Sequence, residues 1–327
     1  MDALRDALSE AFALAQQWLF ETLVQPLVFG AGLGGRLEEA FDATGWLLIG
    51  LIQVLIIVIF IGALERWRPV EPVQDRQAVR VDVIYTLIHQ LGLVRVLMFF
   101  ALDPTLDAVS GQMRLAGLPT FQLDAVWPGV SDQPWVSFGL YLAVFDFIGY
   151  GLHRAQHHFS WWWALHALHH SQRQMTKWSD NRNHLLDDVL LAAAFALLAR
   201  LIGVGPQQFV ALVALQQLVQ NLQHANARIW FGRVFERVLV SPRFHRRHHA
   251  MGTGHESTGK GSLGGHNFAV LFPVWDIVFG TADWRPRYDA TGIRDQLPQE
   301  GARDYGRGFW RQQWLGLQRL VGGLMGQ

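Results

Sequence analysis

Apolar stretches long enough to cross a membrane recur along the first two-thirds of the chain. The clearest one runs from Gly45 to Ala63 and carries no charge, with Gln53 as its polar interruption. About 20 apolar residues in a helix span the hydrocarbon core of a bilayer. This stretch therefore predicts a transmembrane helix; a buried core helix is the alternative.

Three further regions are apolar but contain isolated ionisable residues. Two of them are the single stretches Val83–Leu102 and Trp135–Leu152, and the third comprises two arms, Leu185–Val204 and Gln207–Leu222. Glycines and a proline between the arms predict a turn, so the arms should form a helical hairpin. We expect three full spans plus this transmembrane or re-entrant hairpin, four to five spans in all.

Basic and acidic residues alternate between these stretches. Residues 1–44 hold two Arg and seven acidic residues, and residues 103–134 hold one Arg and four Asp. By contrast, residues 65–82 hold four Arg, residues 153–183 four basic residues and residues 223–268 seven. Because cytoplasmic loops carry the excess of Lys and Arg, we expect the basic segments inside and the N-terminus outside. The expected location is the inner membrane of a bacterium.

Composition narrows the possible classes of protein. Half of the 327 residues are hydrophobic, 17% are charged, and 27 Lys and Arg balance 27 Asp and Glu. Balanced charge argues against a nucleic-acid partner. The chain has no Cys, which excludes disulfides and thiolate metal sites. Its distinctive chemistry is histidine, since 13 of the 14 histidines lie between His153 and His266.

These histidines form three clusters. The first pairs His153 with His157, and the two others have the pattern HxxHH: His166, His169, His170 and His245, His248, His249. On a helix, residues four apart share a face, whereas consecutive residues point about 100° apart. The last two histidines of each HxxHH cannot point the same way, so the pattern suits two metal ions side by side. Imidazole binds Zn, Cu, Fe and Ni, so ligand type alone does not name the metal.

Two more histidines flank the expected hairpin, level with the clusters. His224 follows the second arm and is a predicted ligand, and His184 precedes the first arm and is a further candidate. His158, His255 and His266 adjoin a cluster or lie in a glycine-rich loop, where solvated side chains are the alternative.

Polar groups near the clusters are candidates to support the ligands. Asp146 lies seven residues before His153, on the same helical face and within a span. Intramembrane carboxylates are generally functional, so we expect Asp146 to support a ligand histidine, with a helix-to-helix hydrogen bond as the alternative. Asn226 is expected to orient a ligand or a bound water. Further carboxylates of this kind are Asp187, Asp188 and Asp276.

Together these motifs resemble the fatty acid hydroxylase / sterol desaturase superfamily of integral-membrane, histidine-rich di-iron oxygenases. The similarity covers about Phe138 to Thr281 and includes, besides the clusters, Arg182-Asn-His184, Gln223-His224-Ala-Asn226 and Trp275-Asp276. The resemblance implies two iron ions held by eight or more histidines, and O₂-dependent oxidation of a lipid C–H bond. Leu185 stands where the family often has Pro.

Hydroxylation of a lipid or acyl chain is thus the expected reaction, and desaturation at the same site is an alternative. A histidine-rich metal-binding or metal-transport protein is another. Transport predicts ionisable residues across several spans, but only His89 lies inside one. With no Cys and no dinucleotide-binding motif, electrons should come from a separate ferredoxin- or cytochrome-like donor and its reductase. We expect Arg243, Arg246 and Arg247 to dock that donor.

The expected fold is all-α: an integral membrane bundle with a cytoplasmic, helical, histidine-rich di-metal domain. Residues 1–44 would form an amphipathic peripheral region, and residues 45–134 the first two transmembrane helices. Residues 135–281 would form the catalytic domain with the third helix and the hairpin. Residues 282–327 would form a loop and a helix, Gly308–Val321, that lies on the membrane surface or packs on the cytoplasmic domain.

Overall fold

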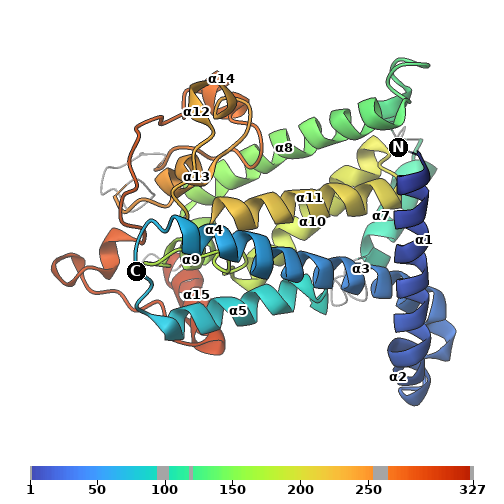
Figure 1. The fold of residues 1–327 in the computed structure, drawn as a ribbon, viewed down its shortest axis with the longest axis horizontal. Helices are drawn as coiled ribbons and strands as arrows, with labels where there is room; N and C mark the ends of the chain where they lie inside the picture. The colour runs from blue at the N-terminus through green and yellow to red at the C-terminus, as the bar shows by residue number, and fades with distance from the viewer. Residues whose placement is uncertain (1, 94–102, 118–120, 253–263, 325–327) are drawn as a thin grey trace.

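The computed structural model of the chain describes residues 2–93, 103–117, 121–252 and 264–324 (Figure 1). Within these residues it contains helices and no β-strand; an isolated bridge pairs Ala250 with Thr291. The prediction of an all-helical protein is confirmed for this part of the chain.

Long helices run side by side along the long axis of the molecule (Figure 1). They are α3 (Leu37–Ile56), which continues through the π-helical turn η3 (Ile57–Ile61) into α4 (Gly62–Trp67), then α5 (Arg76–Gln90), α8 (Pro134–His158), α10 (Leu185–Ile202) and α11 (Pro206–Gln223). Among the described residues, two helices are long and apolar enough to cross a membrane, Gly34–Trp67 and Pro134–His158. They contain the expected first and third spans.

The expected hairpin is present as α10 and α11. Gly203 has a left-handed φ of 75°, which ends α10, and Pro206 occupies the first turn of α11. The hydroxyl of Tyr141 donates to the carbonyl oxygens of Ile202 and Gly203, at 3.2 and 3.1 Å, and so attaches the turn to α8. Each arm has 18 residues, about 27 Å of helix, so its crossing of the bilayer stays a prediction.

The expected second span, Val83–Leu102, is not one continuous helix. Helix α5 ends at Gln90, and Gly92 follows with a φ of 77°, a backbone conformation that ends a helix. Residues 94–102 lie outside the described residues. His89, on α5, lies 3.3 Å from the carboxylate of Asp188 on α10, so this isolated histidine has a charged neighbour.

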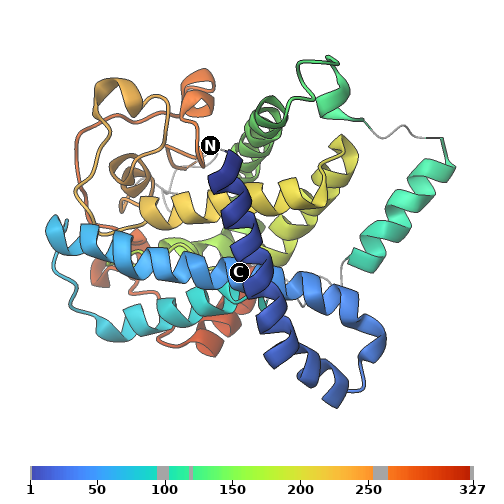
Figure 2. The same cartoon turned by 45° about the vertical axis from the view of Figure 1, so that its right-hand side comes forward.

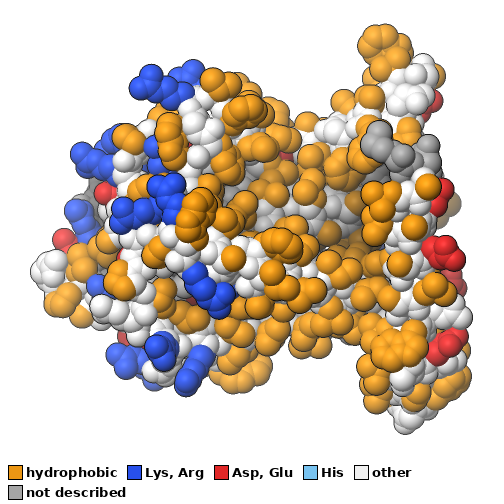
Figure 3. Space-filling model, in the orientation of Figure 1, with side chains coloured by type: hydrophobic (Ala, Val, Ile, Leu, Met, Phe, Trp, Pro, Cys, Tyr) orange, Lys and Arg blue, Asp and Glu red, His pale blue; other side chains and the backbone are white. Residues whose placement is uncertain are grey.

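The N-terminal helix α1 (Asp2–Leu19) lies across the end of the bundle opposite the histidines and is not aligned with the long helices (Figures 1 and 2). It is followed by η1 (Phe20–Val24), α2 (Gln25–Gly30) and η2 (Gly34–Arg36). Acidic side chains lie along this end, whereas Lys and Arg gather around α4 and α13 at the other (Figure 3). The charge alternation along the sequence thus becomes an opposition between the two ends of the molecule.

Shorter elements complete the fold. They are α7 (Asp103–Leu115), η4 (Leu123–Ala125), α9 (Ser160–His170), α12 (Gly232–Phe235), α13 (Pro242–His248), α14 (Val274–Val278), η5 (Arg294–Gln296), η6 (Pro298–Glu300) and α15 (Phe309–Leu324). The expected C-terminal helix is therefore present, and it packs on α9 and α5. Arg319 donates to the carbonyl oxygen of Ala164 at 3.0 Å, and Gln313 donates to the Tyr85 hydroxyl at 2.9 Å.

The close approach of α3 to α5 gives a first prediction. A Cβ atom added to Gly50 would lie 1.6 Å from the carbonyl oxygen of Gln90, so Gly50→Ala must push the two helices apart. We expect a loss of about 1–3 kcal/mol, seen as a lower midpoint of thermal unfolding in detergent. Gly139→Ala in α8, where an added Cβ has no atom within 4 Å, is the control and should unfold no earlier. Equal midpoints for Gly50→Ala and the native chain would contradict the packing.

The charge opposition gives a second prediction. Because the native chain has no Cys, single cysteines report sidedness without background. Asp132→Cys precedes α8 at the acidic end, and Gln299→Cys lies in η6 near the basic end. In intact spheroplasts, a membrane-impermeant maleimide should label Asp132→Cys, and should label Gln299→Cys only after permeabilisation. The reverse pattern would invert the proposed orientation.

Candidate metal centre

Nine histidines converge at the basic end of the bundle. They come from the C-terminal end of α8, from α9, from the residue after α11, and from α13 and the residue after it. Their ring nitrogens form two groups, and within each group the nitrogens lie within 4.8 Å of one another. The five-histidine group is His153, His157, His166, His170 and His248; the four-histidine group is His169, His224, His245 and His249.

Helical spacing decides which histidine joins which group. His166 and His170, four residues apart on α9, share the five-histidine group, whereas His169 joins the other. On α13 the assignment is reversed: His245 and His249 share the four-histidine group, and His248 joins the five. The last two histidines of each HxxHH therefore lie in different groups. That they bind different ions stays a prediction.

The four-histidine group has the dimensions of a coordination site. The Nε2 atom of His224 lies 3.1 Å from that of His169, 3.2 Å from that of His249 and 3.0 Å from that of His245. Nitrogens bound at about 2.0–2.1 Å to one metal ion in a tetrahedron are roughly 3.3 Å apart. The spacing of these nitrogens is thus close to that required for a shared metal.

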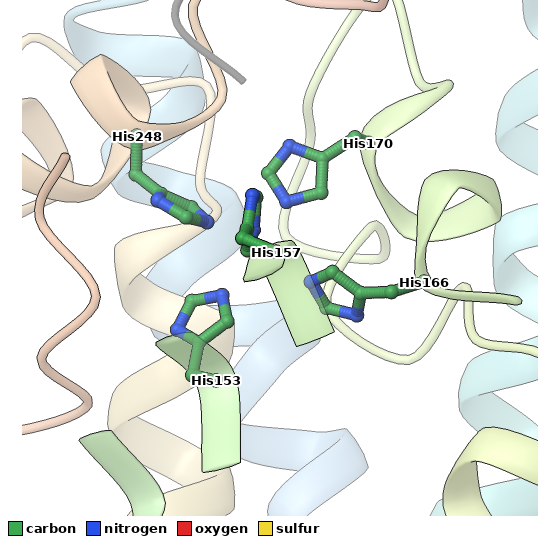
Figure 4. A group of neighbouring side chains, drawn as sticks. All are labelled: His153, His157, His166, His170 and His248. Atoms are coloured by element: carbon green, nitrogen blue, oxygen red, sulfur yellow. The ribbon is translucent and has the colours of Figure 1, made fainter. Parts of the chain in front are cut away.

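The five-histidine group surrounds a second such point (Figure 4). Its side chains come from α8, α9 and α13 and direct ring nitrogens into a shared space. The Nε2 atoms of His166 and His170 are buried and have no hydrogen-bond partner among the described residues. Buried imidazole nitrogens without a partner are costly unless a ligand binds them. Both groups therefore fit metal ions by donor type, burial and spacing.

In two histidines of the five-histidine group, the other ring nitrogen is fixed by a hydrogen bond. The Nδ1 atom of His153 lies 2.9 Å from the carbonyl oxygen of Phe268, and that of His248 lies 2.7 Å from the carbonyl oxygen of His266. Since a carbonyl only accepts, each Nδ1 carries the proton, and each Nε2 keeps its lone pair for a metal.

Carboxylates support one histidine in each group. The Nδ1 atom of His166 lies 3.2 Å from Asp187, whose carboxylate also accepts from Gln156 and from the Trp162 indole at 2.6 Å. In the other group, the Nδ1 atom of His224 lies 3.2 Å from Asp180 and 2.9 Å from the carbonyl oxygen of Gln220. Burial raises the pKa of Asp180 to about 7.

Burial favours the neutral form of six of the ligand candidates. It lowers the pKa of His224 to about 4, and it lowers the pKa values of the ligand candidates His169, His170, His245, His248 and His249 well below 6.5. Protonation of the neighbouring imidazoles would lower them further by repulsion. Neutral imidazole is the form that binds a metal, so at neutral pH the lone pairs are available.

His184 does not join the other nine predicted ligands. It is the N-terminal cap of α10, where its Nδ1 accepts from the Leu186 amide at 3.1 Å. Its Nε2 lies 2.9 Å from the carbonyl oxygen of Gln313. Both ring nitrogens are thus used in protein hydrogen bonds, and we leave His184 out of the proposed ligand set.

Asp146 does not contact a histidine either. Its carboxylate accepts from the amides of Leu271 and Phe272, at 2.6 and 3.0 Å, and from the indole of Trp275 at 2.8 Å. It therefore ties α8 to α14, through Trp275, and to the loop before α14. The alternative, a helix-to-helix hydrogen bond, is thus present, whereas direct support of a ligand histidine is not. Backbone amides are common to every residue except proline, so the sequence could not identify those of Leu271 and Phe272 as the partners.

Asn226 also serves the backbone and not a ligand. Its side chain accepts from the amides of Val70 and Glu71, at 3.1 and 3.2 Å, and donates to the carbonyl oxygen of Glu71 at 2.7 Å. These bonds hold the backbone that follows α4 against the backbone that follows His224.

The three arginines expected to dock an electron donor are turned inward. Arg246 is bonded to Glu71 at 2.7 Å, Arg247 to Asp283 at 2.7 Å and to Asp289, and Arg243 to Glu236. Their side chains are 3%, 8% and 12% exposed, so they stabilise the fold around α13 and offer little charge to a partner.

Three histidines had a solvated side chain as the alternative to metal binding. Of these, His158 is exposed, and His266 is half-buried, with its carbonyl oxygen accepting a hydrogen bond from His248. His255 lies outside the described residues.

The sequence did not identify Asp180 as a support for a ligand histidine, although it stands four residues before His184 in a run of polar residues. Backbone carbonyls, such as that of Phe268, give no sequence signal.

Comparisons with known proteins relate part of this chain to lipid hydroxylases and monooxygenases. The family model "Fatty acid hydroxylase" matches residues 138–281, which include all nine grouped histidines. An alkylglycerol monooxygenase of Caenorhabditis elegans is 28% identical over 151 residues, which are 46% of this chain and 27% of that relative. The aligned part thus spans about a quarter of the relative's length. No solved structure matches the chain.

Because the histidines form two groups, loss of one ligand should remove one metal ion and leave the other. His224→Ala removes one of the four nitrogens of its group, so metal in the purified protein should fall from about two ions per chain to about one. His184→Asn is the matched control: Asn can still cap α10, and both ions should remain. Elemental analysis of the two variants measures this. An equal loss of metal in both would contradict the assignment of His184.

Proposed function

We propose that this chain, whose residues 138–281 belong to the fatty acid hydroxylase superfamily, is a membrane-bound, O₂-dependent hydroxylase of a lipid or acyl chain. Two iron ions would occupy the two histidine groups. The observation that carries the proposal is the pair of adjacent groups of imidazoles, eight of the nine rings buried, at the end of a membrane-length helix.

The donor set suits this chemistry. When bound, a pair of iron ions supplied with O₂ and two electrons provides the oxidising power to attack an unactivated C–H bond. Neutral nitrogen ligands do not neutralise the positive charge of the iron ions, and they can leave coordination positions open for oxygen. Imidazole is also a common iron ligand. Nine imidazoles and no thiolate are what this chain offers.

The chain's own residues hold and shield the site. The hydrogen bonds from His153 to Phe268 and from His166 to Asp187 fix ring orientation, so Nε2 points inward without rotation. The ring of Phe268 is 1% exposed, and it lies 5.2 Å from the ring of His157 and 5.6 Å from that of His248. Such an apolar wall excludes water, which protects a strong oxidant from side reactions.

The position of the site favours a lipid as substrate. His153 and His157 are on α8, which is one of the two helices suited to cross the membrane. A chain dissolved in the bilayer would therefore meet the site where α8 leaves the membrane. The relative's printed activity, monooxygenation of an alkylglycerol, is of the same class. Electrons would come from a separate donor protein that docks elsewhere than on the paired arginines of α13.

Desaturation would use the same ligands, and the product distinguishes it. Metal transport is less well supported, because the grouped histidines lie at one end of the bundle and do not follow a path through it. His89, the histidine inside the bundle, lies against Asp188.

Lipid mass spectrometry tests the proposal. Cells producing the intact chain should contain a lipid with one added oxygen atom that cells producing His169→Ala lack, because that variant loses a nitrogen of the four-histidine group. His184→Asn is the control and should retain the product. Loss of two hydrogens without oxygen would establish the desaturase instead.

Identical lipid profiles for the intact chain and His169→Ala would refute lipid oxidation in that host. Substantial activity in protein stripped of metal by a chelator would refute the metal mechanism itself.

A further inference from the structure

Two short helices outside the spans expose an unusual amount of apolar surface. Helix α12 and the segment around it, with α14 and the residue after it, lie beside α8 at the metal end (Figure 1). We name their exposed apolar side chains the apolar ledge: Trp230, Val234, Phe235, Val238, Leu239, Val274, Ile277, Val278 and Phe279. Phe235 is 67% exposed and Val278 66%. Contiguous apolar surface of this kind marks an interaction site.

The two parts of the ledge belong to one structural unit. The amide of Val240, just after the α12 segment, donates to the carbonyl oxygen of Leu271, just before α14, at 2.9 Å. Val240 also packs with Phe268 and Trp275 in one buried cluster. The ledge is therefore a fixed surface of the domain that carries His245, His248 and His249.

The ledge adjoins the helix expected to cross the bilayer. On α8, the ring of Phe147 contacts Trp275 at 4.8 Å and Phe279 at 6.3 Å, and Tyr150 stacks on Phe279 at 5.3 Å. Phe147 and Tyr150 are within the helix expected to cross the bilayer, before its end at His158. The α14 segment thus packs directly against the expected membrane helix α8.

The charge of the ledge fits a phospholipid surface. Arg233 and Arg237 are exposed on the α12 segment. The two acidic residues of the ledge segments are turned inward: Glu236 is 3% exposed and bonded to Ser241 and Arg243, and Asp276 is fully buried and accepts from Phe268 and Ala269. Within residues 230–239 and 274–279, which the structure describes, the exposed side chains therefore include apolar groups and cations but no carboxylate.

We propose that the apolar ledge inserts into the headgroup region of the cytoplasmic leaflet, with Arg233 and Arg237 on lipid phosphates. Amphipathic surfaces with a basic rim bind bilayers in this way, with apolar side chains about 5–10 Å below the headgroups. The insertion would hold the metal domain at the lipid surface. It would also fix Asp276, which positions Phe268, whose carbonyl oxygen accepts from His153.

Spin labels on single cysteines test the insertion, and the absence of native Cys makes the labelling specific. Labels would be placed at Phe235→Cys and Val278→Cys, in vesicles of phosphatidylcholine and phosphatidylglycerol. Leu55→Cys, on the exposed face of α3, is the membrane reference, and Gln299→Cys in η6 is the aqueous reference. Collisions with O₂ and with a water-soluble nickel chelate report the depth of each label.

Both ledge labels should show high O₂ and low nickel accessibility, shallower than Leu55→Cys. Nickel accessibility equal to that of Gln299→Cys would overturn the proposal. Protection from both reagents would also overturn it, because it would mean that a second protein copy covers the ledge. The measurement needs neither metal nor substrate, so its outcome is independent of the proposed hydroxylase activity.

The arginines are tested on the Val278→Cys background. Arg233→Gln with Arg237→Gln should raise nickel accessibility at the label in vesicles that contain phosphatidylglycerol, because the basic rim is lost. An unchanged depth would overturn the role assigned to the two arginines.

Discussion

The structure depends on packing nine imidazoles, eight of them buried, into two small groups. Each buried ring has two nitrogens to satisfy, and a charged ring beside others would be strongly repelled. In His153, His224 and His248, Nδ1 bonds to a backbone carbonyl oxygen, which can only accept. These oxygens belong to Phe268, Gln220 and His266, respectively. The inward Nε2 atoms are left for metal ions, so binding of metal and stability of this end of the bundle are expected to be linked.

Sequence reasoning succeeded where local geometry decides the outcome. The spacings of three and four residues on α9 and α13 determine which face each histidine occupies, and these faces persist in the fold. It failed where a distant backbone decides. His184 is at the right end of the molecule, but helix α10 needs a cap, and Gln313 on the C-terminal helix takes its other nitrogen. Asp146 likewise meets loop amides more than a hundred residues away.

In the membrane helices, too, the features set by local sequence were predicted and those set by distant contacts were not. Continuous apolar sequence identified α3 and α8, and charge alternation anticipated the opposed acidic and basic ends. The interruption at Gly92 was not anticipated, because one glycine within an apolar run is common in membrane helices and becomes a helix end only through its left-handed φ. Arg243, Arg246 and Arg247 were expected on the surface, but a run of basic residues does not reveal carboxylates from Glu71, Asp283 and Glu236.

Two buried carboxylates connect the membrane helix, the metal groups and the ledge. Asp146 holds the amides of Leu271 and Phe272 to α8, and Asp276 holds those of Phe268 and Ala269. Between them they fix the backbone from which Phe268 supports His153 and from which α14 projects its apolar side. A carboxylate binding two amides is satisfied without a counter-charge, so it tolerates burial beside a membrane. If the proposed metal binding and membrane insertion hold, the same few hydrogen bonds would set both the orientation of the His153 ring and the position of the domain at the bilayer.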